Sequence, residues 1–493
     1  MEPITLFKSI YSVVLLIFSL VSVAAMIAYR QTNLSDSAHP AVAYIVFAAA
    51  ILWLTMVEGG QASLVGLAPV NKELYKDSHP KSYMSTKITN EGDNLDRYLL
   101  GRQFMVVLVV FCVNMSAAPI GGAELWGYPE WVKNIFFQFG LAMILITCMV
   151  GQLNTQVNAS HCMLDYIDNY FAVFTLWVAM SIEFSGLLHA SYLIQIIVGL
   201  LAGKPIESNE GPKTGFNLVF FWARVLFSLV ALGFCFAVTM VALFSNRTTM
   251  WEGIPPTLAV VIFFILMCVV GMLEGMQIAF FAVAKLRASE RGESFFAMKT
   301  CHLLYSGEGH NLPGFMVGRQ LCVVSCMFFV ARVTSVKIEE GEDNIFGVPE
   351  IIQKFFNTGL LGALMLTILG SISWQLVASA FPLAFLSNPI TYILLRICLA
   401  LEATGICQGA WVIAAVHRKI SGFQRDEVYI GTAEERAKQD MGDDVDQPQI
   451  GAGHPVKLPN FKEGAPSALQ KLVAQDSAVE RYMNELATKV DQV

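Results

Sequence analysis

Long apolar runs alternate with short polar segments over the first 416 residues of the chain. A helix needs about 20 apolar residues to cross the hydrocarbon core of a membrane, and ten runs reach or approach this length. They cover residues 10–29, 41–67, 103–120, 134–151, 171–201, 216–244, 257–284, 315–335, 355–372 and 390–416. The pattern predicts an all-α integral membrane protein with about ten transmembrane helices.

The composition agrees with a membrane protein. Hydrophobic residues make up 55% of the 493 residues and charged residues 14%, whereas soluble domains carry about 25% charged residues. The net charge of −7 gives no basic footprint for a nucleic acid. Most of the ten cysteines lie inside apolar runs, which favours a packing role. None of the eight histidines lies in a metal-binding or triad-like motif, so we expect neither an enzyme nor a cofactor.

Polar landmarks recur in the two halves of the chain at a nearly constant offset. The stretch VEGGQ at 57–61 returns 216 residues later as LEGMQ at 273–277, and the triplet GRQ at 101–103 returns 217 residues later at 318–320. Further pairs are WGYPE at 126–130 with FGVPE at 346–350, and IEFSG at 182–186 with LEATG at 401–405. These matches predict an internal repeat.

The repeat boundaries predict the topology. Residues 1–213 and 214–416 would each hold five helices, and five crossings reverse the side from which the second repeat enters. We therefore expect two five-helix inverted repeats, as in many secondary transporters, with a binding site between them.

Basic residues suggest the orientation. Both the loop between the second and third runs and the end of the tenth run, at His417, Arg418 and Lys419, are basic, which favours cytoplasmic N- and C-termini. We expect the plasma membrane, with an intracellular vesicle membrane as the alternative. Inversion conflicts with one feature, because it places the loop with Lys285, Arg287, Arg291 and Lys299 outside.

The repeated motifs carry charges into otherwise apolar runs. An unpaired charge at a helix centre costs about 2.5 to 3.5 kcal/mol on insertion scales, so these charges need partners. We expect E-G-x-Q to end helices 2 and 7 and GRQ to open helices 3 and 8, forming a cage of donors and acceptors that suits a small solute with several hydroxyl groups. The alternative is that Glu–Arg pairs only fix helix packing. The candidate substrate-binding residues are Glu58, Gln61, Gly101, Arg102, Gln103, Glu274, Gln277, Gly318, Arg319 and Gln320.

A second symmetric set offers oxygen ligands for a coupling cation. Its members are Asn154, Gln156, Ser160, Glu183, Ser373, Gln375, Ser379 and Glu402. The alternatives are ordinary interhelical hydrogen bonds and, for the two glutamates, pairing with Arg224 or Arg396. Asp165 and Asp168 have no counterpart in the second half and are expected in a solvated loop.

The chain after the tenth run changes character. Residues 417–465 are polar and contain glycine and proline, which predicts a flexible linker. In 466–493, Leu472, Val479, Leu486 and Val493 recur every seven residues. This spacing predicts a coiled coil, or alternatively a lone amphipathic helix, that binds a second copy of the chain or another protein.

The paired E-G-x-Q and GRQ motifs in two five-helix halves, with this tail, resemble the silicon transporter family of the diatom type. The resemblance implies a membrane-embedded secondary active symporter that couples sodium entry to the uptake of orthosilicic acid, a neutral molecule with four hydroxyl groups, for silica biomineralisation. It assigns the substrate to the two motif pairs and leaves the sodium site unassigned. A carrier of another hydroxylated solute such as boric acid, and a passive channel for silicic acid, remain the alternatives.

Overall fold

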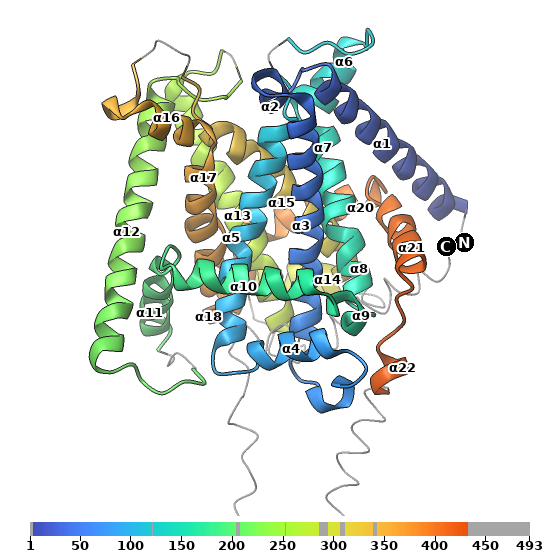
Figure 1. Ribbon diagram of the computed structural model, residues 1–493, viewed down its shortest axis with the longest axis vertical. Helices are drawn as coiled ribbons and strands as arrows, with labels where there is room; N and C mark the ends of the chain where they lie inside the picture. The colour runs from blue at the N-terminus through green and yellow to red at the C-terminus, as the bar shows by residue number, and fades with distance from the viewer. Residues whose placement is uncertain are drawn as a thin grey trace, which may run out of the picture.

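The computed structural model describes residues 3–120, 122–203, 208–251, 253–284, 294–305, 311–338 and 343–431. This part of the chain is helical, and its only β pairing consists of two isolated bridges. Figure 1 shows a bundle of long, roughly parallel helices with short helices at its two ends. The predicted coiled coil and most of the predicted linker lie outside the described residues.

The first half contains α1 (Pro3–Ala28), α2 (Asn33–Ser37), α3 (Pro40–Leu67), η1 (Lys72–Tyr75), α4 (Pro80–Thr89), α5 (Asn94–Ala117), α6 (Glu130–Val132), η2 (Lys133–Gln138), α7 (Leu141–Ile146), η3 (Thr147–Leu153), α8 (Asn154–Ala159), α9 (Met163–Ile167), α10 (Tyr170–Phe184) and α11 (Ala190–Ala202). The second half contains α12 (Gly215–Phe244), α13 (Pro256–Ala284), α14 (Phe295–Tyr305), α15 (Asn311–Thr334), η5 (Ile345–Gly347), α16 (Glu350–Asn357), α17 (Leu360–Met365), η6 (Leu366–Ile372), α18 (Ser373–Ala380), α19 (Pro382–Leu386), α20 (Pro389–Ala403), α21 (Gly409–Ser421) and α22 (Glu427–Ile430).

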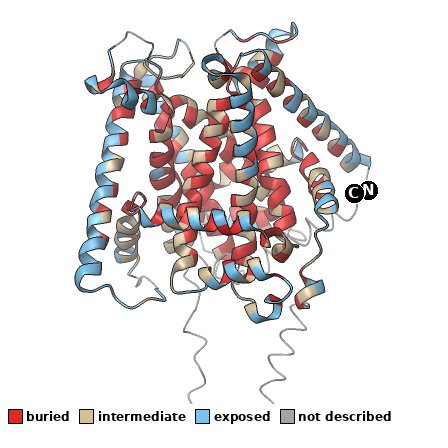
Figure 2. Ribbon diagram, in the orientation of Figure 1, coloured by how far each residue is buried: buried red, intermediate tan, exposed pale blue. Residues whose placement is uncertain are grey.

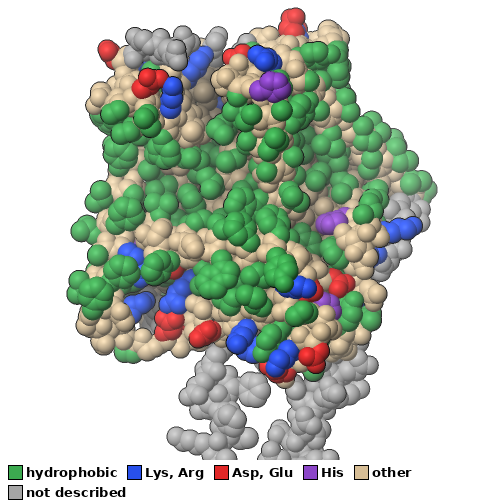
Figure 3. Space-filling model, in the orientation of Figure 1, with side chains coloured by type: hydrophobic (Ala, Val, Ile, Leu, Met, Phe, Trp, Pro, Cys, Tyr) green, Lys and Arg blue, Asp and Glu red, His purple; other side chains and the backbone are tan. Residues whose placement is uncertain are grey.

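Seven helices in the described part are long and apolar enough to cross a membrane. A bent pair, Glu130–Gln138 with Leu141–Ala159, makes an eighth if it is one span. The outward faces of α1 and α12 carry exposed apolar side chains, and Figures 2 and 3 show these faces as exposed and largely hydrophobic. Apolar surface of this extent suits contact with lipid, so the protein is an integral membrane protein of helical type.

The last predicted crossing of each half is among those that are broken. Residues 171–201 form α10 and α11, and residues 390–416 lie in α20 and α21. The breaks contain Gly186 (φ +85°) and Gly405 (φ +71°), in the left-handed region where side chains are disfavoured. In Figure 1, α10 lies across the bundle and α11 then turns towards its lower end.

The relative orientation of the halves differs from the predicted inversion. The equivalent helices α6 and α16 both lie at the upper end of Figure 1. At that end, Arg332 near the end of α15 donates to the carbonyl of Gln138, in the segment that follows α5. Helices α5 and α15 therefore end on the same side, and the halves run in parallel. The physical reason is the bend at Gly186, because α10 and α11 do not carry the chain across the bundle as a fifth crossing.

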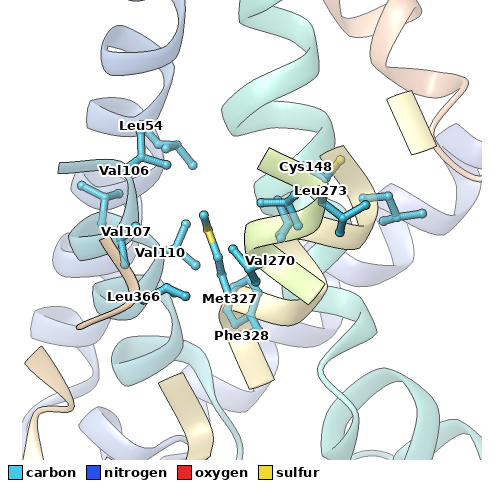
Figure 4. Close-up of a cluster of buried hydrophobic side chains, with 14 of the residues drawn as sticks. Leu54, Val106, Val107, Val110, Cys148, Val270, Leu273, Met327, Phe328 and Leu366 are labelled. Carbon is cyan, nitrogen blue, oxygen red and sulfur yellow. The ribbon is translucent and has the colours of Figure 1, made fainter. Parts of the chain in front are cut away.

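The core packs between the two halves. Figure 4 shows buried side chains that meet at the centre, among them Leu54 from α3, Val110 from α5, Val270 from α13 and Met327 from α15. Helices α5 and α15 contact each other; α5 also packs against α17 and η6 of the second half, and α15 against α7 and η3 of the first half. This apolar core lies around the polar residues described below, several of which are buried.

Candidate solute-binding site

The repeated motifs lie inside continuous helices. Glu58 is well within α3, which continues to Leu67, and Glu274 is likewise within α13. The triplet at 101–103 begins seven residues after the start of α5, and the triplet at 318–320 lies seven residues into α15. The expectation that E-G-x-Q ends a helix and GRQ opens one is therefore wrong, because none of the glycines of these motifs adopts a left-handed conformation.

Each half holds a buried glutamate–arginine pair. The Oε2 atom of Glu58 lies 2.6 Å from Nη2 of Arg102, and the Oε1 atom of Glu274 lies 3.5 Å from Nη1 of Arg319. All four side chains are at most 8% exposed. Burying a lone charge would be costly, so pairing each glutamate with an arginine offsets the cost of placing these four groups inside the bundle.

Hydrogen bonds continue from each pair into the opposite half. Arg102 donates to Oε1 of Gln103 (2.8 Å), and Nε2 of Gln103 donates to Ser371 Oγ in the second half (2.8 Å). Arg319 donates to Oε1 of Gln320 (3.0 Å), and Nε2 of Gln320 donates to Oε1 of Gln152 in the first half (2.6 Å). Gln103 and Gln320, the glutamines of the two GRQ motifs, therefore each reach across the interface between the halves.

Two further links close the bonds into a ring. Gln152 donates to Glu58 (3.1 Å), while Gln375 donates both to Glu274 (2.8 Å) and to Ser371 (3.4 Å). We call the resulting closed circuit the central ring; its members are Glu58, Arg102, Gln103, Ser371, Gln375, Glu274, Arg319, Gln320 and Gln152. Gln156 is attached to it through a bond to Glu58 (3.2 Å). The ring joins the halves at two points, Gln103–Ser371 and Gln320–Gln152.

Gln152 and Ser371 occupy equivalent positions, 219 residues apart, and both lie on π-helical segments, η3 and η6. A π-helical segment widens the helix locally and often occurs at functional sites. The sequence motifs did not reveal these two residues, because a glutamine in one half stands opposite a serine in the other. Only the π-helical widening at matching positions marks them.

The glycines of the motifs serve close packing. A Cβ atom at Gly101 would lie 1.9 Å from the carbonyl oxygen of Ala179, and one at Gly318 would lie 1.9 Å from the carbonyl oxygen of Cys398. These glycines let α5 and α15 approach α10 and α20 and thereby set the position of the adjacent arginines. We therefore assign Gly101 and Gly318 to helix packing rather than to contact with a solute.

Two predicted residues stay out of the ring. Gln61 and Gln277 are half-buried, and neither makes a hydrogen bond within the part of the chain that the structure describes. They lie one turn beyond Glu58 and Glu274 on the same helix face. Their amides therefore lie next to the ring and outside its hydrogen bonds.

The residues of the predicted ion-coupling set lie in different surroundings, some at the central ring and others away from it. Gln156 and Gln375 contact the ring glutamates. Ser160 and Ser373 donate instead to backbone carbonyls of their own helices, and Asn154 bonds Asn158 and His417. Ser379 is half-buried. The structure therefore brings only the two glutamines of this set to the central ring.

The two intramembrane glutamates have different surroundings. Glu183 accepts a hydrogen bond from Tyr192 (2.9 Å) and lies 3.8 Å from Nε2 of His189. Arg224, its expected partner, donates to the carbonyl of Phe184 instead. Glu402 lies beside Gly314 and makes no hydrogen bond within the described residues.

Asp165 and Asp168 are not in a solvated loop. Asp165 contacts His79 (3.0 Å) and accepts from the backbone of Gln424 (2.6 Å), while Asp168 accepts from the backbone N–H groups of Lys81 and Ser82. Both aspartates tie α9 and the following turn to neighbouring segments. Their role is structural, at the lower end of the bundle in Figure 1.

Comparison with known families decides the identity. A model of the silicon transporter family matches residues 1–491. The chain belongs to the silicon transporter family. Comparison with curated proteins and with solved structures gives no match.

For a silicon transporter, the composition of the ring is informative. It contains two carboxylates, two guanidinium groups, four glutamine amides and one hydroxyl, so its formal charge is zero. Carboxylates accept, guanidinium groups donate, and amides and hydroxyls do both. Such a set can bind a neutral solute whose hydroxyl groups each donate and accept, which matches the substrate class of this family.

Proposed function

We propose that this silicon transporter binds orthosilicic acid at the central ring and carries it between its two halves by alternating access. The observation that supports this most is the circuit itself. It lies at the interface of the halves, and both of its crossing points are hydrogen bonds that a polyhydroxylated solute can replace. A solute that takes over these bonds would change how the halves are held together.

The parallel arrangement suits such a motion. In carriers whose halves are related by an axis along the membrane normal, the halves rock about a substrate site near the midplane. The ring lies within the four long helices, about two-thirds of the way along α3 and α13 and about one-third of the way along α5 and α15, so its substrate site would lie inside the membrane. Opening on one side and then on the other would expose the same ring in turn.

The charge balance supports a neutral substrate. A site for an anion needs an excess of positive groups, whereas here each arginine is neutralised by a glutamate. Four hydroxyl groups arranged as a tetrahedron can contact both pairs at once. Boric acid, with fewer hydroxyl groups, would satisfy fewer of these partners.

Sodium coupling is the second part of the proposal. One monovalent cation moving through about 100 mV releases about 2.3 kcal/mol, enough for a solute gradient of roughly fifty-fold. Glu183 is the carboxylate we favour for cation coupling, because it is buried, lies outside the ring and has no arginine of the described residues within ion-pair distance. The family resemblance motivates the choice of sodium.

The test is uptake into proteoliposomes. Labelled silicic acid, or germanic acid as its tracer, is supplied with an inward sodium gradient or with choline in place of sodium, for the native chain and for Arg102→Ala and Gln320→Ala. Accumulation that requires sodium and is lost in both variants, while each still folds and inserts, supports the proposal. Uptake that ignores sodium and never exceeds equilibrium indicates a channel, and normal uptake in both variants assigns the ring to packing alone.

The control for this test is a residue away from the ring. Lys354→Ala removes an exposed cation that pairs with Glu350 on α16. Surface ion pairs contribute little to stability, about 0 to 1 kcal/mol, so this variant should transport normally. Its use corrects for differences in expression and reconstitution.

A further inference from the structure

The two sides of the central ring are not equally satisfied. Glu58 accepts hydrogen bonds from Gln152 and Gln156 and pairs with Arg102 at 2.6 Å. Among the described residues, Glu274 accepts one hydrogen bond, from Gln375, and its distance to Arg319 is 3.5 Å. A carboxylate offers about four acceptor sites, so Glu274 keeps more of them open than Glu58 does. We call Glu58 and Arg102 the first side of the ring, and Glu274 and Arg319 the second side.

Arginine donors show the same imbalance. Arg102 has one buried nitrogen without a hydrogen-bond partner, Nε, whereas Arg319 has two, Nε and Nη1. Arg319 is only 5% exposed, so these donors face the interior rather than bulk water. Buried donors are nearly always paired in proteins, and the exceptions are often places where a ligand binds.

Ser371 is the physical origin of the difference. Its equivalent, Gln152, is longer by a methylene and an amide and reaches Glu58 directly. Ser371 is too short for the corresponding contact with Glu274, and its hydroxyl accepts from Gln103 and Gln375 instead. The second side therefore has unfilled hydrogen-bonding capacity next to the smaller side chain.

We propose that silicic acid first binds on the Glu274–Arg319 side of the ring, and that Ser371 is the residue that makes room for it. This inference rests on the proposed function, because it assumes that the ring binds the solute. One hydroxyl of the solute donates to Glu274, and its oxygen accepts from Nε of Arg319 and from Nη1, which faces Glu274 at 3.5 Å without a hydrogen bond. The first side, already closed by Gln152, holds the halves together until the solute has bound.

The experiment exchanges the two residues. Binding of labelled germanic acid to the purified full chain is measured by equilibrium dialysis for the native protein, Ser371→Gln, and the double variant Gln152→Ser with Ser371→Gln. Ser371→Gln should weaken binding at least about tenfold, the effect of losing one charge-assisted hydrogen bond. The double variant reverses the two sides and should recover more than half of this loss on a logarithmic scale.

Several results would overturn the inference. Ser371→Gln that binds as tightly as the native chain shows that the room beside Ser371 is not used, and a double variant as weak as Ser371→Gln shows that the sides are not interchangeable. Size-exclusion profiles and melting temperatures establish that each variant is folded. If a variant does not fold, Ser371→Asn, which fills less of the same space, replaces the glutamine on that side.

Failure of the proposed function would look different. Glu274→Gln is measured in parallel, and native-like binding in that variant removes the ring from the binding site altogether. Impaired binding in Glu274→Gln together with native-like binding in Ser371→Gln leaves the proposed function standing and overturns only the preference for the second side.

Discussion

The two halves of the molecule are alike at the centre and different at the bends of their last helices. At the centre, each half contributes a glutamate, an arginine and a glutamine that crosses to the other half. At the bends, Glu183 is held by Tyr192 beside His189, whereas the residues at the same offset from Glu402 are Gln408 and Trp411. The comparison teaches that a shared task keeps the centre matched, while the bends are free to take separate roles.

The most decisive way to test the comparison is to determine whether equivalent segments of the two halves face the same side of the membrane. Cysteines introduced at Lys76 and Lys299, over the background of the native cysteines, should react with an impermeant maleimide from one and the same side. A cysteine at Glu350 should react only from the opposite side. Labelling of Lys76→Cys and Lys299→Cys from opposite sides would restore the inverted arrangement.

Breaking one ion pair should have the largest effect on stability. Arg319→Ala leaves Glu274 buried without its cation, which costs about 3 to 5 kcal/mol. Arg102→Ala should cost a similar amount. Adding Glu274→Gln to Arg319→Met removes both charges and should restore most of the melting temperature in detergent. A double variant as unstable as Arg319→Ala would show that the charge imbalance is not the cause.

Filling the tight helix contacts should come next. Gly101→Ala and Gly318→Ala each place a methyl group 1.9 Å from a backbone carbonyl oxygen, so each should destabilise by about 1 to 3 kcal/mol. Gly233→Ala in α12 is the matched control, since a Cβ there meets nothing within 4 Å. Equal melting temperatures for all three variants would contradict the close approach of these helices.

The bends should respond unequally. Glu183→Gln weakens a hydrogen bond that Tyr192 donates to a charged acceptor, a class worth about 1.5 to 3 kcal/mol. Glu402→Gln disrupts no hydrogen bond of the described residues and should change the melting temperature less. Sodium dependence of uptake, measured on both variants, sharpens the difference: we expect it to change in Glu183→Gln. Identical behaviour of the two variants would show that the bends are equivalent after all.

The smallest expected effect concerns pH at the lower end of the bundle. Asp426 accepts from the backbone N–H groups of Met163 and Leu164, both at 2.8 Å, and thereby fixes residues 422–431 against α9. Burial raises the pKa of Asp426 to about 7, against the opposing effect of these two bonds. Between about pH 4 and pH 7, Asp426 therefore keeps its proton while residues 422–431 are docked and loses it when they are released.

This shift sets the direction of the pH effect. Because the docked state binds more protons, docking should weaken as pH rises from about 4 to about 7 and then level off. Hydrogen exchange of the Met163 and Leu164 amides, corrected for intrinsic rates, should show faster opening at pH 8 than at pH 5.5. Asp426→Asn should remove this dependence, whereas Asp168→Asn, which alters a neighbouring cap, should preserve it. Protection that increases with pH would contradict the assignment.

Sequence reasoning located the charged members of the ring because the motifs repeat. Glu58, Arg102 and Gln103 and their counterparts could be recognised as residues in need of partners. The partners themselves could not be found, since Gln152 and Ser371 differ in type and meet the motifs only through the register of helices distant in sequence. That register depends on close contacts such as those at Gly101, which no local pattern encodes.

The topology was predicted wrongly for a different reason. From its apolar length alone, the segment 171–201 was predicted to be one crossing. Gly186 bends this segment, so the first half no longer has an odd number of crossings and the second half is not inverted. Lys299 on α14 carried a signal against inversion, because the positive-inside rule favours one side of the membrane both for α14 and for the basic loop between α3 and α5. A charge bias present in both loops deserved more weight than a count of apolar runs.

The central claim is that the ring binds silicic acid, and one measurement tests it most directly. The neutral double variant Glu274→Gln with Arg319→Met keeps the packing of the pair but removes its charges, and its binding of labelled germanic acid can be compared with that of the native chain at equal melting temperature. The account predicts a folded protein whose tracer binding is at least about tenfold weaker, because two charge-assisted partners are lost. A folded variant that binds the tracer as tightly as the native chain would contradict it.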